Sequence, residues 1–176
     1  MYKAAQIFWF TGLSGSGKTT LAEGVRERLK IHGNKVRIID GDDIRSTRHK
    51  HLGFSPSDIK KNNALIADLC AEKRNAYDAI IVPVISPYAE ARSTARRILG
   101  DGFHEVYISA ELPTLESRDP KGLYARARNG EIKNLIGFSP TNIYEPPTNP
   151  DITVKTDLQS VNLSIDLLYR FFRQHV

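Results

Sequence analysis

Apolar positions along this chain fall into short continuous runs that alternate with longer stretches of helical spacing. Runs rich in β-branched and aromatic residues predict buried strands, and apolar residues every three or four positions predict helices. The predicted strands cover residues 6–11, 36–40, 79–85, 105–109 and 151–155. The predicted helices cover residues 18–32, about 55–75, 89–99 and 158–174.

This order of elements predicts an α/β fold. Repeated strand–helix units form parallel sheets, so we expect a five-stranded parallel sheet with helices on both faces. Residues 113–150 are polar and rich in Gly, Pro, Asn and Arg. A long irregular stretch in a compact domain is typical of a functional lid. We therefore predict one domain, residues 1–176, with a lid at about residues 113–150.

Composition adds limits on the class of protein. The chain has 176 residues, of which 40% are hydrophobic and 26% charged, as expected for a single globular domain. Its one cysteine, Cys70, cannot form an internal disulfide and is predicted to be a small core residue. No run approaches the roughly 20 apolar residues of a membrane span, and no signal-peptide pattern is present. We expect a cytoplasmic protein without a membrane partner.

The formal net charge of +5 allows two interpretations. A basic chain can bind nucleic acid, but here the basic residues are scattered rather than clustered. A cleft that holds two anionic substrates also requires excess positive charge. We therefore expect a small anionic nucleotide as partner and no nucleic acid polymer.

The strongest motif lies between the first predicted strand and the first predicted helix. Residues 12–19, Gly-Leu-Ser-Gly-Ser-Gly-Lys-Thr, match the P-loop pattern G-x-x-x-x-G-K-[ST] without a mismatch. Glycines let the backbone fold tightly around phosphate oxygens, and the helix directs its positive end to the same place. Lys18 is predicted to reach the β- and γ-phosphates of ATP, and Thr19 to supply a hydroxyl to Mg²⁺. The predicted ATP-binding residues are Gly12, Leu13, Ser14, Gly15, Ser16, Gly17, Lys18, Thr19, Thr20 and, in the lid, Arg118.

Acidic residues end the second predicted strand, at Ile-Ile-Asp-Gly-Asp-Asp of residues 38–43. Ligands of parallel α/β sheets bind at the carboxyl ends of strands. A carboxylate there can hold Mg²⁺ or accept a proton from an acceptor hydroxyl. Asp40 and Asp42 are therefore candidate catalytic residues, and which of them acts as base stays open. The alternative is a solvated turn, with Asp43 at the start of a helix.

These blocks together resemble the adenylylsulfate kinase (APS kinase) family, over about residues 6–157. The matching blocks are Gly-Leu-Ser-Gly-Ser-Gly-Lys at 12–18, Asp-Gly-Asp-Asp-Ile-Arg at 40–45, Leu-Gly-Phe-Ser at 52–55, Ile-Ser-Pro-Tyr at 85–88, Arg-Asp-Pro-Lys-Gly-Leu-Tyr at 118–124 and Gly-Glu-Ile-Lys at 130–133. The resemblance implies a P-loop kinase that phosphorylates the 3′-hydroxyl of adenylyl sulfate with ATP. It also suggests a homodimer.

The resemblance also implies roles for individual residues. Lys18, Asp40, Asp42 and Ser86 would be catalytic, although direct in-line transfer does not need the phosphoserine that Ser86 would form. Thr19 and Asp40 would hold the metal. The implied acceptor-binding residues are Asp42, Arg45, Phe54, Ile59, Asn62, Ile85, Ser86, Lys133 and Leu135.

Three departures from the family pattern fall in the implied acceptor site. Ile59 and Ala89 stand where the family has arginine, and Leu135 stands where it has phenylalanine. The loss of an arginine–anion hydrogen bond removes on the order of 1.5–3 kcal/mol. Either Lys60, Lys61 or Arg92 compensates in an enzyme for adenylyl sulfate, or the acceptor is another nucleotide, such as a cytidine diphosphate derivative (cytidine diphosphoramidate). A regulatory P-loop ATPase is a further alternative, against which the basic lid argues.

Overall fold

The computed structural model describes residues 4–140 and 142–176; residues 1–3 of the predicted domain and Thr141 of the predicted lid lie outside this part. Its strands form one parallel sheet in the order β2-β3-β1-β4-β5. They are β1 (Gln6–Thr11), β2 (Val36–Ile38), β3 (Ala79–Pro83), β4 (Phe103–Ser109) and β5 (Ile152–Lys155). The predicted five-stranded parallel sheet is confirmed.

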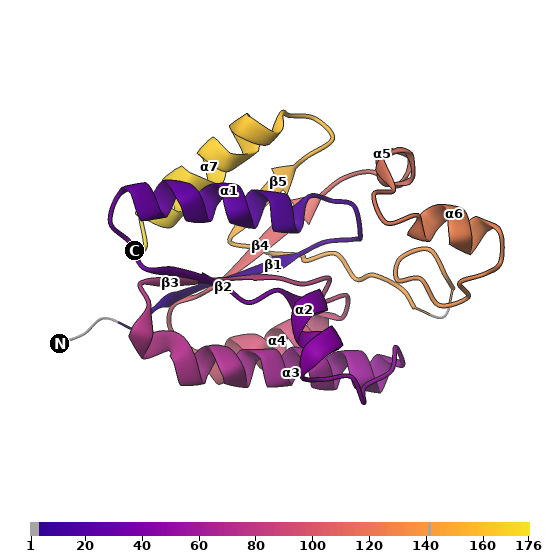
Figure 1. The fold of residues 1–176 in the computed structure, drawn as a ribbon, viewed down its shortest axis with the longest axis horizontal. Helices are drawn as coiled ribbons and strands as arrows, with labels where there is room; N and C mark the ends of the chain where they lie inside the picture. The colour runs from indigo at the N-terminus through magenta and orange to yellow at the C-terminus, as the bar shows by residue number, and fades with distance from the viewer. Residues whose placement is uncertain (1–3, 141) are drawn as a thin grey trace.

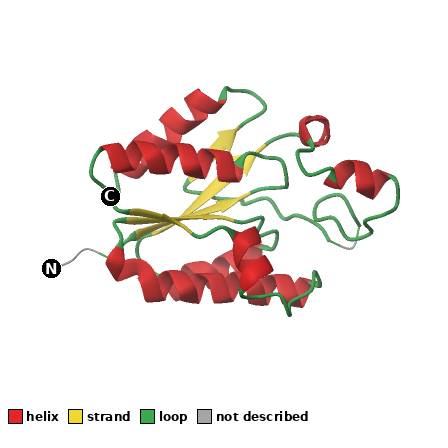
Figure 2. Cartoon of the chain, viewed as in Figure 1, coloured by secondary structure: helices red, strands yellow, loops and turns green. Residues whose placement is uncertain are grey.

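Helices cover both faces of this sheet, as Figures 1 and 2 show. They are α1 (Lys18–Ile31), α2 (Gly41–Thr47), α3 (Pro56–Lys73) with the 3-10 turn η1 (Arg74–Ala76), α4 (Ala89–Leu99), α5 (Leu112–Arg118), α6 (Leu123–Arg128) and α7 (Val161–Arg173). Helices α1 and α7 lie on one face, and α3 and α4 lie on the other (Figure 1).

The sequence of β1 explains why both faces are covered. Successive side chains of a strand point to opposite faces. Phe8 and Phe10 accordingly pack in the cluster formed with α1 and α7, whereas Ile7 and Trp9 pack in the cluster formed with α3 and α4. Cys70 lies fully buried in the second cluster, as predicted. A central strand that is apolar from Ile7 to Phe10 therefore favours a three-layer arrangement.

Several predicted boundaries are wrong, each for a local reason. The second strand ends at Ile38 because the Asp40 side chain accepts a hydrogen bond from the Asp42 amide and begins α2. The third strand ends at Pro83, which has no amide hydrogen to continue the ladder. The stretch predicted to be irregular contains α5 and α6, which project beyond the carboxyl end of the sheet (Figure 1).

Candidate functional site

The phosphate loop joins β1 to α1 at the carboxyl end of the sheet. Gly12 has a φ of +154°, and a Cβ there would lie 2.2 Å from the carbonyl oxygen of Ile108, so only glycine fits. Gly17, with a φ of +97°, stands at the N-cap of α1 in the left-handed region. These glycines allow the chain to reverse direction tightly beside a cleft of about 440 Å³.

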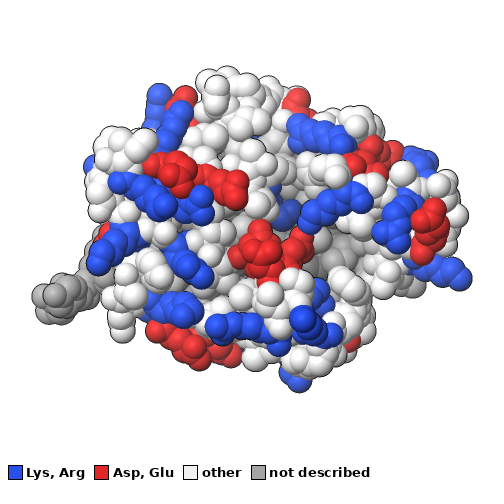
Figure 3. Space-filling model, viewed as in Figure 1, with Lys and Arg blue, Asp and Glu red and all other residues white. Residues whose placement is uncertain are grey.

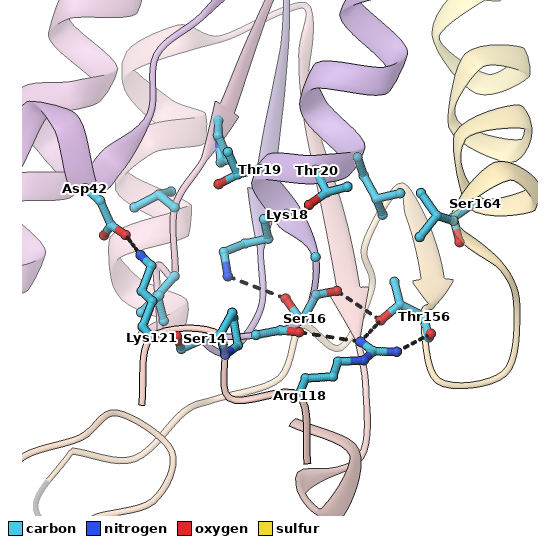
Figure 4. Close-up of a pocket in the computed structure, with 18 of the residues that line it drawn as sticks. Ser14, Ser16, Lys18, Thr19, Thr20, Asp42, Arg118, Lys121, Thr156 and Ser164 are labelled. Carbon is cyan, nitrogen blue, oxygen red and sulfur yellow. Dashed lines mark hydrogen bonds and ion pairs between the residues drawn. The ribbon is translucent and has the colours of Figure 1, made fainter. Parts of the chain in front are cut away.

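Most of the predicted ATP-binding residues line this cleft. The lining comprises residues 14–21 and 83–85 together with Asp40, Asp42, Arg118, Pro120, Lys121, Thr156, Gln159, Val161 and Ser164. Gly12 and Leu13 are not among them; they contribute backbone carbonyls that hold Lys18. Figure 4 shows how the loop, the start of α1 and the lid converge here.

Lys18 is held at the floor of the cleft by the loop itself. Its Nζ donates to the carbonyl oxygens of Gly12 and Leu13, at 2.8 Å each. Burial lowers the pKa of Lys18 from 10.5 to about 8, against the opposing attraction of Asp42 and Asp40; nearby Lys121 lowers it further. The loop therefore holds a lysine whose charge is only partly compensated.

Thr19 and Asp40, the predicted metal pair, lie together. The Thr19 hydroxyl donates to Oδ2 of Asp40 at 3.1 Å, while Oδ1 accepts from the Asp42 amide at 2.8 Å. No group of three or more His, Cys, Asp or Glu side chains suited to a metal occurs in residues 4–140 and 142–176. Mg²⁺ is usually bound by one or two carboxylates together with substrate phosphates, so a hydroxyl and a carboxylate fit its chemistry.

The lid reaches the cleft through two cations. Lys121 donates to Oδ2 of Asp42 at 2.5 Å, and this bond is the largest cause that raises the pKa of Lys121. Arg118 donates to the carbonyl oxygen of Thr156 at 2.6 Å and to its hydroxyl at 3.0 Å. Both contacts are drawn in Figure 4. The lid therefore closes on the acidic edge of the cleft at one point and on the β5–α7 connection at another.

Sequence reasoning missed part of this lining. Lys121 stands in a recognised lid block, but it received no role, although a second cation three positions after Arg118 is a usable signal. Thr156 and Gln159 were not singled out. They approach the phosphate loop only because β5 lies beside β4 in the sheet. The sequence around them does not predict which strands are neighbours.

The predicted acceptor-binding residues divide into exposed and buried ones. Phe54 is 54% exposed, and the guanidinium of Arg45 lies 4.8 Å from the centre of its ring. Lys133 is also exposed. Asn62 is only 2% exposed, and its Oδ1 lies 2.8 Å from Nδ1 of His49. An aromatic ring with an arginine over it thus faces solvent, whereas Asn62 is held inside.

Two predicted acceptor residues, Ile59 and Leu135, are packed in the interior. Ile59 lies in an apolar cluster with Tyr88 and Ile136, and Leu135 lies in the cluster centred on Leu115 and Tyr124. The exposed fractions of Ile59 and Leu135 are 2% and 8%. The side chains at these two departures from the family pattern therefore contribute packing in this structure.

Ser86 and Ile85 form a turn after β3. Ile85 lines the cleft, whereas Ser86 is 1% exposed and adopts a φ of +44°, in the left-handed region. The Ser86 hydroxyl is buried and has no hydrogen-bond partner among the described residues. The proposed catalytic hydroxyl therefore lies beneath the cleft surface rather than on it.

Arg92 is committed to the interior and is not available to an acceptor, contrary to one of the expected compensations. Its guanidinium donates to Oε1 of Glu105 at 2.6 Å and to the carbonyl oxygens of Ser86 at 2.8 Å and Glu145 at 2.7 Å. The Arg92 side chain is 4% exposed. Lys60, a second expected compensation, pairs with Glu90.

One face of the molecule shows how its surface charges are distributed. Lys and Arg side chains are spread over the face shown in Figure 3 and intermixed with acidic ones, rather than gathered in one stripe. Among residues 4–140 and 142–176, none of the helices combines the length and apolar character that crossing a bilayer requires.

Comparisons with known proteins point to one family. The family model described as adenylylsulphate kinase matches residues 4–155. An adenylyl-sulfate kinase of Halothermothrix orenii is 44% identical over 170 residues, covering 94% of this chain and 88% of that protein. One from Clostridium acetobutylicum is 39% identical over 169 residues, covering 96% and 84%.

A solved structure has the same fold over nearly the whole length of both chains. The APS kinase of Mycobacterium tuberculosis, in complex with AMPPNP and APS, superposes with a TM-score of 0.88 at 35% identity. The alignment covers 97% of this chain and 98% of that one.

Proposed function

This chain belongs to the adenylylsulphate kinase family, and from that premise we propose that it transfers the γ-phosphoryl group of ATP to the 3′-hydroxyl of adenylyl sulfate. The observation that carries the proposal is the cleft at the carboxyl end of the sheet. It brings the phosphate loop, two strand-end carboxylates and two lid cations to one place. Phosphoryl transfer needs mainly positioning and charge stabilisation, and this set supplies both.

ATP would bind with its phosphates on the loop of residues 12–19. Lys18 would contact the β- and γ-phosphates, and an anion there would offset the burial that lowers the pKa of the lysine. Thr19 and Asp40 would hold Mg²⁺, which when bound would neutralise charge on the phosphate oxygens. Arg118 and Lys121 would approach the same phosphates from the lid.

The acceptor would attack in line with the departing ADP. A bond forms between the acceptor 3′-oxygen and the γ-phosphorus while the bond from that phosphorus to the β–γ bridging oxygen breaks. The proton of the 3′-hydroxyl goes to a carboxylate. We assign this role to Asp42, because both oxygens of Asp40 already accept hydrogen bonds and Asp42 is exposed at the cleft edge. No covalent step on the buried Ser86 is required.

On the acceptor side, Phe54 and Arg45 would contact the nucleotide and Lys133 its anionic group. The segment of residues 113–150 would act as the lid of a single kinase domain, residues 1–176. Closure of such a lid excludes water, so transfer to the acceptor competes well against hydrolysis. Cytoplasmic location and a homodimer remain predictions.

The test is ATP-to-ADP turnover by the purified protein with Mg²⁺ and adenylyl sulfate, with product identified by phosphorus NMR. We expect turnover that depends on the acceptor and a product phosphorylated at the 3′-oxygen. Lys18→Ala and Asp42→Asn should each lower kcat by at least about 100-fold, since each removes a group that acts in the transition state. Arg97→Ala, on the exposed side of α4, is the matched control and should leave kcat unchanged. Turnover at the same rate without acceptor would instead identify a regulatory ATPase.

A cytidine diphosphate derivative, such as cytidine diphosphoramidate, is a second candidate acceptor. Two of the three departures from the family pattern, Ile59 and Leu135, are buried packing residues. At the third, Ala89, the backbone amide donates a hydrogen bond to the Glu145 carboxylate at 2.6 Å. A smaller pyrimidine would need less stacking than adenine. The same assay with a panel of cytidine and other nucleoside 5′-diphosphate derivatives separates the two acceptors. Turnover with a cytidine derivative and silence with adenylyl sulfate would favour the second.

A further inference from the structure

Asn142 is a buried amide at the junction of several loops. Its side chain is 3% exposed. Its Nδ2 donates to the carbonyl oxygens of Phe54 at 3.3 Å and Asn134 at 2.9 Å, and its Oδ1 accepts from the Tyr88 hydroxyl at 3.1 Å. Its backbone carbonyl oxygen accepts from the Gly137 amide at 2.7 Å. Both amide hydrogens and both carbonyl groups of this residue are thus used.

The partners of Asn142 belong to segments that are distant in the sequence but carry the proposed acceptor contacts. Phe54 is itself the exposed aromatic ring over which Arg45 lies. Asn134 directly follows Lys133. Tyr88 ends the turn of residues 85–88, whose Ile85 lines the cleft.

From this arrangement we infer that Asn142 is a positioning residue for the acceptor, which sets the place of Phe54 relative to the loop of residues 133–137. The inference rests on the proposed function, because it assigns the acceptor to these segments. Asn142 does not line the ATP cleft, so we expect its replacement to affect the acceptor more than ATP.

The amide suits this task because one planar group both donates twice and accepts. Aspartate would keep the acceptor for Tyr88 but would place a carboxylate oxygen against two carbonyl oxygens. Alanine would leave two partly buried carbonyl oxygens and the buried Tyr88 hydroxyl without this partner, and each lost hydrogen bond weakens the junction. Tyr88 is a dependable donor, since burial and the nearby Glu145 raise the pKa of its hydroxyl.

The first measurement compares steady-state constants of the wild type, Asn142→Ala, Asn142→Asp and Tyr88→Phe. Asn142→Ala should raise the acceptor KM by about tenfold or more, with the ATP KM changed less than about threefold. Asn142→Asp should be at least as impaired, and Tyr88→Phe should shift the acceptor KM in the same direction by less. Asn149→Ala, an exposed asparagine of the same return segment, is the matched control and should behave as wild type.

Parallel losses for both substrates, or no change for either, would overturn the inference. A second measurement, amide hydrogen exchange, tests the inference without an activity assay. It compares the wild type with Asn142→Ala, or with Tyr88→Phe if Asn142→Ala fails to fold. Exchange should become faster in the segments around Phe54 and Gly137 and stay unchanged in residues 12–20. Unchanged exchange around Gly137 would refute the positioning role of Asn142. If the wild type turned over none of the acceptors, the proposed function would fall, and the exchange result would still decide the role of Asn142.

Discussion

Lys18 illustrates how the site is built at the scale of one residue. In the absence of nucleotide, the Lys18 ammonium is bound by the backbone carbonyl oxygens of Gly12 and Leu13. These two hydrogen bonds only partly replace the hydration that the ammonium would have in water. Burial lowers the pKa of Lys18 to about 8. The ammonium is therefore disfavoured in the folded protein without nucleotide, and bound phosphate would reverse that penalty.

This penalty predicts a pH-dependent stability. The pKa of Lys18 is about 8 in the folded protein and near 10.5 when unfolded. The charged form therefore destabilises the fold fully below pH 8, and the penalty is relieved as pH rises from 8 to 10.5. Without nucleotide, Lys18→Met should be more stable than wild type at pH 7 by on the order of 1–3 kcal/mol, and this difference should shrink by pH 10. Urea unfolding at several pH values measures it; a pH-independent difference would contradict the expectation.

The predictability of the site from sequence varies residue by residue. The loop of residues 12–19 could be predicted because its chemistry depends on neighbours in the chain, and its glycines adopt the required conformations. Asp40 and Asp42 followed from their place after a strand. Lys121 could have been assigned to the cleft as a second lid cation, but its contact with Asp42 depends on how the lid folds back. Thr156 could not be assigned, because its approach to the cleft depends on which strand lies at the sheet edge.

At the scale of elements, the sequence predicted strands and long helices well and short helices poorly. The five strands and α1, α3, α4 and α7 appear at the predicted places, since each has a clear apolar period. Helix α2 was anticipated only through Asp43 as a helix start, whereas it begins at Gly41; Asp40 as N-cap and two acidic residues in its first turn are a readable signal for that start. Helices α5 and α6 are too short to show a period, so their stretch was predicted to be irregular.

The contact of α1 with α7 gives a prediction at this scale. Gly24 lies within α1, where glycine costs about 1 kcal/mol relative to alanine. A Cβ at Gly24 would lie 2.3 Å from Cδ1 of Ile165 and 2.9 Å from its Cγ1. Gly24→Ala should therefore be destabilising despite its better helix propensity, since overpacking costs about 1–3 kcal/mol. Ile165→Val removes the Cδ1 methyl, which makes the closer of the two contacts, and keeps Cγ1, so the same alanine should cost less in that background.

A double-mutant cycle measured by thermal unfolding tests this helix contact. The coupling between Gly24→Ala and Ile165→Val should be favourable by on the order of 1 kcal/mol. Gly33→Ala is not a suitable control, because Gly33 has a φ of +84°. Ala71→Gly on the other face of the sheet, combined with Ile165→Val, should instead be additive. Additivity of the first pair would show that the helices adjust their spacing without strain.

At the scale of the whole molecule, residues distant in the sequence are tied together beneath the cleft. The Thr11 hydroxyl, at the end of β1, donates to the Ile85 carbonyl oxygen at 2.7 Å and lies 2.9 Å from the Tyr144 hydroxyl. Burial raises the pKa of Tyr144, so this tyrosine stays protonated and can donate to Thr11. The start of the phosphate loop, the turn after β3 and the segment that returns from the lid are thus linked through one buried hydroxyl.

Arg92 extends this link and carries the last prediction. It joins the carbonyl oxygens of Ser86 and Glu145 to the Glu105 carboxylate, three points that only the complete fold brings together. Removing one partner of a buried ion pair costs about 3–5 kcal/mol, because the other charge is left unpaired. Arg92→Leu should therefore lower the free energy of unfolding in urea by that amount.

The matched control for Arg92 lies on the same helix. Arg97 is exposed, so Arg97→Leu should change stability by less than about 0.5 kcal/mol. Arg92→Leu combined with Glu105→Leu should recover part of the loss, since no buried carboxylate then remains unpaired. If Arg92→Leu costs as little as Arg97→Leu, the three segments hold together without the guanidinium. If the double variant is no better than the single one, the stabilisation comes from the two carbonyl bonds rather than from the ion pair.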